Sequence, residues 1–299
     1  MFRILTYIVL IIFIAIRFEN VRQNSEIGYR EDFEFAKRIH KYSNNVVKKV
    51  LPSPHKELLL GMTIGDDGFS NLPTFNDMLR KTGTIHVVVV SGFNISLVYG
   101  LLFKIFGSPY KLRNLVFAGI GALVYAGISG FDPPVIRSWI MGSIFTLGKY
   151  YGRKIDTLQV LMFSAIIMLL INPLYLISLS FQLSFLATLG LVLFSERISK
   201  LMPNNNVLFQ DLTATLSAQT LVVPLLMYRF GTLSLISPIV NMLILWTVPL
   251  ITVLGGLLLI LGWIPVIGDI LGFACFLPLE FFTFMVEMFS KIPFAQIHI

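Results

Sequence analysis

Long apolar segments follow one another along most of this chain, with short polar stretches between them. From residue 84 onward we expect membrane helices at 84–106, 112–130, 134–151, 157–171, 175–195, 208–228, 235–262 and 266–290. A helix that crosses the hydrocarbon core needs about 20 predominantly apolar residues, and most of these segments approach that length. The pattern therefore predicts an all-α, polytopic membrane helix bundle.

The first third of the chain has a different pattern. An apolar run between two arginines ends at residue 16, and no small-residue cleavage site follows it, so we interpret residues 1–16 as a retained N-terminal membrane anchor. Residues 17–83 mix charged and apolar positions, which indicates an amphipathic or soluble region, interfacial or extracytoplasmic. Residues 84–295 then form the predicted multi-pass domain.

Proline interrupts several of the predicted spans, at Pro134, Pro173, Pro224 and Pro238. Proline removes a backbone donor and kinks or ends a helix. Broken helices persist in a bilayer only where protein or a water-filled cavity surrounds the freed backbone groups. We therefore expect some of these helices to be broken or re-entrant.

Small residues recur every four positions in the first two spans of the multi-pass domain. Gly92, Ser96 and Gly100 form one such stripe, and alanines from 118 to 126 with Gly130 form another. In lipid, small residues allow two helix backbones to approach closely. Both stripes predict helix packing faces.

Composition agrees with a membrane protein, because 56% of the residues are hydrophobic and only 13% are charged. The net charge of +7 is spread along the chain and is typical of basic loops between spans. The chain has four histidines and one cysteine and contains no zinc-protease or phosphate-loop motif. We expect no metal, no cofactor and no enzymatic activity.

Eight polar side chains fall inside the predicted spans, where hydrocarbon around them is costly unless they face a partner or water. We interpret them as candidates for the lining of a hydrated path: His86, Ser91, Asn94, Arg137, Gln182, Ser184, Gln219 and Asn241. For Arg137 an equally simple interpretation is a helix-end residue that reaches the headgroups. Two lines of Thr, Ser, Asp and Gln on residues 211–220 also favour a wet cavity.

Three blocks of the sequence together resemble a known family. They are "TGTIHVVVVSGFNISLVYG", then "DPPVIRSWIM" with "INP" and "FQLSFLATLG", and "LSAQTLVVPLLMYRFGTLSLISPIVNML". In this order they are similar to the membrane domain of the ComEC competence protein family. The resemblance implies a channel for single-stranded DNA in the cytoplasmic (inner) membrane during natural transformation.

The family motif falls on positions throughout residues 45–290. Asn94 departs from it, because many relatives have a second histidine there. The matching positions are His86, Ser91, Gly92, Pro134, Arg137, Arg153, Asp156, Asn172, Pro173, Phe181, Gln182, Ser184, Phe185, Pro224, Phe230, Pro238 and Asn241.

The resemblance also carries expectations about partners. Longer members have an OB-fold-like domain and a metallo-β-lactamase-like domain, for which we see no room here, so we expect no nuclease activity. Partners implied by the family are single-stranded DNA, membrane lipids, an extracytoplasmic DNA receptor, and a cytosolic ATPase or single-strand-binding proteins, with a homo-oligomer left open.

Two roles and two other functions remain open at this stage. Arg137 and Arg229 would supply positive field along the path, and Phe181 or Phe185 would offer faces for bases, although packing is the simpler role for the phenylalanines. A small-molecule or lipid-intermediate transporter on the same fold is the alternative function. A hydrolase using Ser91 is disfavoured, because His86 lies about 140° away on a continuous helix.

Overall fold

The structure is a computed structural model that describes residues 17–19, 21, 34–203, 206–292 and 296–298. The predicted anchor, residues 1–16, lies outside the described residues. The long helices are α2 (Glu34–Val47), α3 (His55–Ile64), α4 (Pro73–Lys81), α6 (Gly92–Phe106), α7 (Leu112–Ile128), α8 (Pro133–Tyr150), α9 (Thr157–Ile171), α10 (Leu179–Ser199), α11 (Val207–Phe230), α12 (Ser237–Ile244), α13 (Thr247–Leu261) and α14 (Pro265–Ser290).

Shorter elements connect these helices. They are the one-turn helix α5 (Ile85–Val88), the 3₁₀ helices η1 (Gly68–Asn71) and η2 (Pro173–Ile177), and the strands β1 (Thr232–Ser234) and β2 (Gln296–His298), which pair antiparallel. Helices dominate the described chain, so the predicted all-α class is confirmed.

Most of the prolines mark where helices begin. Pro133 and Pro134 occupy the first turn of α8, Pro173 opens η2, and Pro238 lies in the first turn of α12. In these positions the missing N–H is one that a helix leaves unbonded in any case. Pro224 lies inside α11, which continues through it.

Helix length and composition identify fewer candidate spans than the eight we expected. Within the described residues, three helical segments are long and apolar enough to cross a membrane: Ile85–Phe106, Leu179–Ser199 and Pro265–Ser290. The bent pair α12 and α13, with 49° between its helices, makes a fourth if it is one span, and its bend is the geometry of a broken span or a re-entrant loop. Helices α7 and α9 are apolar but shorter.

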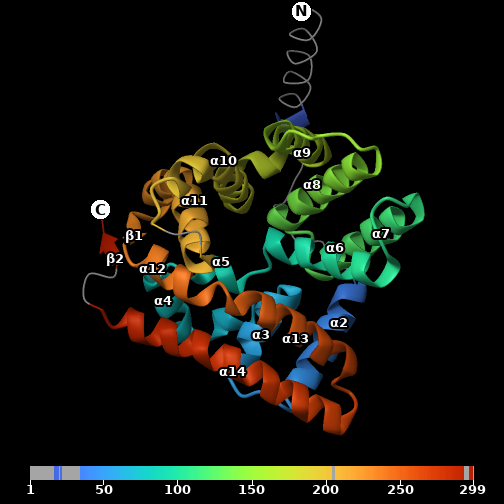
Figure 1. The fold of residues 1–299 in the computed structure, drawn as a ribbon. Coiled ribbons are helices and arrows are strands. Elements are labelled where there is room, and N and C mark those ends of the chain that lie inside the picture. The colour runs from blue at the N-terminus through green and yellow to red at the C-terminus, as the bar shows by residue number, and fades with distance from the viewer. Residues whose placement is uncertain (1–16, 20, 22–33, 204–205, 293–295, 299) are drawn as a thin grey trace, which may run out of the picture.

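The helices assemble into neighbouring groups (Figure 1). In the largest group, α3 is buried among α13, α14, α4 and α5, and Leu58, Leu59 and Phe282 are fully inaccessible. In a second group, Ala118, Ala122 and Ala126 of α7 are buried against α6 and α8, as their spacing predicts. In Figure 1, α14 lies along one side of the molecule and α8 to α10 lie along the other.

The region before residue 84 shares a core with the last helices of the chain. α3 packs against α13 and α14 as well as against α2 and η1, and α2 lies against α7 through His40, whose ring is 2.9 Å from the carbonyl oxygen of Ile128. Residues 34–83 are thus integrated into the helix bundle.

Candidate functional site

Arg137 is held between two helices near the start of α8. Its Nε donates a hydrogen bond to Oγ of Ser184 on α10 at 2.8 Å, and its Nη1 contacts Sδ of Met141 at 3.3 Å. The guanidinium also lies over the ring of Phe185, 5.9 Å from its centroid. The structure therefore brings together two of the predicted path residues, Arg137 and Ser184, from segments 47 residues apart.

The N-terminus of α6 meets the same group. A Cβ placed on Gly92 would lie 2.0 Å from Oγ of Ser138 and 3.1 Å from Nη2 of Arg137, so any larger residue here would require Ser138 to move. Ser91, the N-cap residue, is half-buried and makes no capping hydrogen bond through its side chain. We call Gly92, Arg137, Ser138, Ser184 and Phe185 the Arg137 cluster.

Within the described part of the chain, the positive charge of the Arg137 cluster has no acidic partner. Among the ion pairs of the described residues, none includes Arg137. The first amides of a helix carry partial positive charge, so the start of α6 adds to the field of the guanidinium. An anion is the ligand that such an arrangement stabilises.

Aromatic rings pack together at the cluster. Phe181 is buried, with its ring centroid 4.3 Å from that of Phe185 and 6.3 Å from that of Tyr175. Phe181 thus has two aromatic neighbours within the protein. Packing, the simpler of its two predicted roles, accounts for this ring.

Asn94, another predicted path residue, is buried in a different network. Its Nδ2 donates to the carbonyl oxygen of Met62 at 2.6 Å and to the hydroxyl of Tyr125 at 3.3 Å, and that hydroxyl donates to the carbonyl oxygen of Thr63 at 2.7 Å. These carbonyls belong to the last turn of α3, where a helix leaves its acceptors unsatisfied. Asn94 of α6 and Tyr125 of α7 therefore supply hydrogen-bond donors to the carbonyl groups at the end of α3.

Gln219 and Asn241 converge on one hydroxyl. Nε2 of Gln219 lies 3.0 Å and Nδ2 of Asn241 lies 3.3 Å from Oγ of Ser237. Ser237 in turn faces Gly83, whose added Cβ would lie 2.7 Å from Cβ of Ser237. Asn241 is 1% exposed, so these residues form a buried junction of α11, α12 and the turn before α5.

The remaining polar path residues do not join either group. His86 is exposed on α5. The helix ends between His86 and Ser91, so the two residues do not lie on one continuous helix, but no hydrogen bond links them within the described part of the chain. Gln182 donates to the carbonyl oxygen of Leu176 at 2.8 Å and so provides a hydrogen-bond partner for a carbonyl group of η2.

The first small-residue stripe is divided. Gly92 lies in a close contact, whereas Ser96 is exposed and Gly100 has no atom within 4 Å of an added Cβ. Gly190, which belongs to neither stripe, approaches a helix backbone, because its added Cβ would lie 2.4 Å from the carbonyl oxygen of Ser217. A single glycine without a repeat gives no such signal in the sequence.

The hydroxyls on residues 211–220 are mostly satisfied within α11. Thr213, Ser217 and Thr220 each donate to the carbonyl oxygen four residues earlier. Such bonds are common for helical Ser and Thr and need no water. The two polar lines therefore do not by themselves require a wet cavity.

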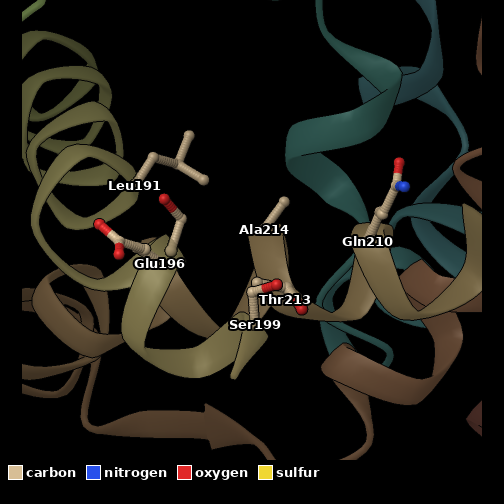
Figure 2. Close-up of a pocket in the computed structure, with 7 residues that line it drawn as sticks. Leu191, Glu196, Ser199, Gln210, Thr213 and Ala214 are labelled. Carbon is tan, nitrogen blue, oxygen red and sulfur yellow. The ribbon is translucent and has the colours of Figure 1, made fainter. Parts of the chain in front are cut away.

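A cavity of about 330 Å³ does lie between α10 and α11, near the loop that connects them (Figure 2). Its polar wall is made of Ser195, Glu196, Ser199, Gln210 and Thr213, and Leu191 and Ala214 complete it. None of the eight predicted path residues belongs to this lining.

Side chains that bind metals do not gather in the described residues, where no group of three or more His, Cys, Asp or Glu is found.

Two residues of the family motif have structural roles at helix starts. Asp156 accepts a hydrogen bond from the amide of Gln159, and Asn172 accepts one from the amide of Leu174. Both are N-caps.

Comparison with known proteins gives one family. The family model described as "Competence protein" matches residues 62–299. "ComE operon protein 3" of Bacillus subtilis (strain 168) is 26% identical over 217 residues, which cover 71% of this chain and 27% of that protein. An "Uncharacterized protein" of Aquifex aeolicus (strain VF5) is 35% identical over 125 residues, 41% of this chain and 30% of the relative.

A third relative is "Recombination protein 2" of Haemophilus influenzae (strain ATCC 51907 / DSM 11121 / KW20 / Rd), 29% identical over 139 residues, or 42% of this chain and 17% of that protein. The chain spans less than a third of the length of each of these relatives. No solved structure shows a significant match.

The apolar helices, the broken pair and the polar groups between them define a helical membrane protein. More particularly, the chain belongs to the competence protein family, because the family model covers most of its length. The resemblance inferred from its three sequence blocks is thereby confirmed.

Proposed function

We propose that the chain conducts single-stranded DNA across the cytoplasmic membrane during natural transformation. Family membership supports a role in competence. The observation that carries the proposal is the Arg137 cluster, where a guanidinium that pairs with no carboxylate of the described residues lies beside the N-terminus of α6. This arrangement suits a phosphodiester, which is a monoanion with two exposed oxygens.

The chemistry of passage follows from these groups. A phosphate oxygen that reaches Nη2 of Arg137 gains a charge-assisted hydrogen bond, and such bonds are shorter and stronger than neutral ones. Phe185 lies beneath the guanidinium, so a base that follows the phosphate meets a half-buried aromatic edge. Single-strand grooves combine basic and aromatic groups in the same way.

Energy and delivery come from other proteins in this proposal. The sequence has no phosphate-binding loop, so a cytosolic ATPase or single-strand-binding proteins would pull the strand, and an extracytoplasmic receptor would present it. The chain itself conducts and does not catalyse. Two or more copies, or separate subunits, would complete an assembly larger than this chain.

The test replaces Arg137 in the native host. Arg137→Gln removes the charge and is expected to lower transformation by at least about tenfold, since a hydrogen bond to a charged group contributes about 1.5–3 kcal/mol. Arg137→Lys keeps the charge without the planar fork and should retain part of the activity. Arg80→Gln, which removes an exposed arginine on α4, is the matched control.

Membrane levels of each variant are measured by immunoblot, and binding of labelled DNA to the cell surface is measured alongside uptake. Normal transformation with Arg137→Gln would refute the role of the cluster. Normal transformation after deletion of the whole gene, together with loss of a transported metabolite, would instead support the small-molecule transporter.

A further inference from the structure

Helices α6 and α8 run in the same direction. Gly92 at the start of α6 faces Ser138 near the start of α8, and the hydroxyl of Tyr99 lies 2.7 Å from that of Ser143. Beyond this second contact each helix continues for seven residues, a rise of about 10 Å. The loops that follow α6 and α8 therefore lie at the same end of the molecule.

Both loops are strongly basic. Together with the last turns of these two helices and the first turn of α7 they carry six exposed cations, which we call the basic rim: Lys104, Lys111, Arg113, Lys149, Arg153 and Lys154. No ion pair of the described residues includes any of the six. The one carboxylate of these segments, Asp156, caps α9.

The loops that join these helices at the opposite end have few charges. The loop between α7 and α8, residues 129–132, contains Asp132 alone, and residues 172–178 between α9 and α10 contain no charged residue. Cations reach this end from the earlier part of the chain, because Arg17 donates to the carbonyl oxygen of Ile171 at 3.3 Å and α2 lies against the end of α7. The charge difference is thus a difference between the connecting loops.

Aromatic and apolar side chains border the basic rim. Tyr110 and Tyr151 are 69% and 68% exposed, and Phe106, Leu112 and Leu147 are exposed directly beside them. Tyrosines at the edge of an apolar surface are typical of the headgroup level of a bilayer. A soluble acidic partner would require no such apolar border.

We propose that the basic rim binds the anionic headgroups of phospholipids in the cytoplasmic leaflet. Basic residues next to the ends of membrane helices favour that leaflet, both by the insertion bias of Lys and Arg and by attraction to its negative surface. The end of α8 that carries Arg137 then faces the extracytoplasmic side. This inference does not depend on the transport of DNA.

Lipid binding is tested by native mass spectrometry of the full chain in detergent, with phosphatidylglycerol and phosphatidylcholine as probes. We expect preferential binding of phosphatidylglycerol. Each basic residue near an anionic surface contributes about fivefold, so the variant Lys149→Gln/Arg153→Gln/Lys154→Gln should lose at least about tenfold of this preference. The control removes the same charge from α2 and the turn after it, by Lys41→Gln/Lys48→Gln/Lys49→Gln.

Orientation is tested by labelling introduced cysteines in spheroplasts with a membrane-impermeant maleimide. Ser108→Cys, in the loop after α6, should react only after permeabilisation, and Ser178→Cys, before α10, should react in intact spheroplasts. The native Cys275 is fully buried and gives the background.

Three results would overturn the inference directly, and a fourth would assign the rim to another ligand. The three are equal binding of the two lipids, an equal loss of preference in the control variant, and labelling of Ser108→Cys from outside. Displacement of phosphatidylglycerol by a single-stranded oligonucleotide would assign the rim to DNA and would also overturn it. Each readout is independent of transformation, so failure here leaves the role of Arg137 untouched.

Discussion

Gly92→Ala is expected to separate α6 from α8 at the Arg137 cluster. The added Cβ would lie 2.0 Å from Oγ and 3.2 Å from Cβ of Ser138, so rotation of the serine alone does not relieve the contact fully. Overpacking of this kind costs about 1–3 kcal/mol. The helix regains less than about 1 kcal/mol from replacing glycine, which leaves a net loss of about 1–2 kcal/mol.

Thermal unfolding in detergent measures this loss, because 1 kcal/mol corresponds to a Tm change of about 2 °C in a chain of this size. Tm should fall by about 2–4 °C in Gly92→Ala. Ser138→Ala removes the clashing hydroxyl, so adding it to Gly92→Ala should restore part of the loss, with a coupling energy of at least about 0.5 kcal/mol. Gly100→Ala, where the new Cβ meets no atom within 4 Å, is the control.

The close-contact explanation would be refuted if Gly92→Ala had the Tm of the wild type, or if Ser138→Ala failed to change the effect of the first substitution. A second readout is transformation. The displaced helix start would move away from Nη2 of Arg137, so uptake should fall together with Tm and should recover in the double variant.

Two further predictions concern contacts elsewhere in the bundle. Gly190→Ala should lower membrane levels and Tm strongly, because its Cβ would meet a backbone atom, the carbonyl oxygen of Ser217, at 2.4 Å; Gly119→Ala, with nothing within 4 Å, should match the wild type. Asn94→Ala should lower Tm by about 2–6 °C, since loss of a buried hydrogen-bond partner costs about 1–3 kcal/mol. The exposed Ser96→Ala should have no effect on Tm, and a fall as large as that of Asn94→Ala would contradict this account.

Much of the helical fold is predictable from the sequence, because apolar runs and helix-starting residues act locally. The segment 235–262 is bent as expected, but the bend lies between α12 and α13 at residues 245–246 and not at Pro238, which starts α12. The effect of each proline is less predictable. Prolines start α8 and η2, but another proline lies inside α11, which continues through it. Which outcome occurs depends on the neighbouring helices, which the local sequence does not describe.

The candidate site is only partly predictable. Polarity within an apolar segment singled out Arg137 and Ser184, but it equally singled out Asn94, which satisfies the end of α3. Polarity shows that a side chain needs a partner and does not show whether that partner is water, a ligand or a backbone carbonyl. Ser138 and Tyr125 were missed because a hydroxyl near a helix end gives no distinctive signal.

The hydrogen bonds between α3 and the side chains of α6 and α7 have a mechanical consequence. Three hydrogen bonds lie at one point, so separating these helices would leave the carbonyl oxygens of Met62 and Thr63 without these donors at the same time. By contrast, a single side-chain hydrogen bond joins α8 to α10 at the Arg137 cluster. Its donor is a guanidinium, which can also donate to a phosphate. Under the proposed function, a phosphate of the strand that binds Arg137 would replace the hydrogen bond to Ser184 and so loosen the contact between α8 and α10.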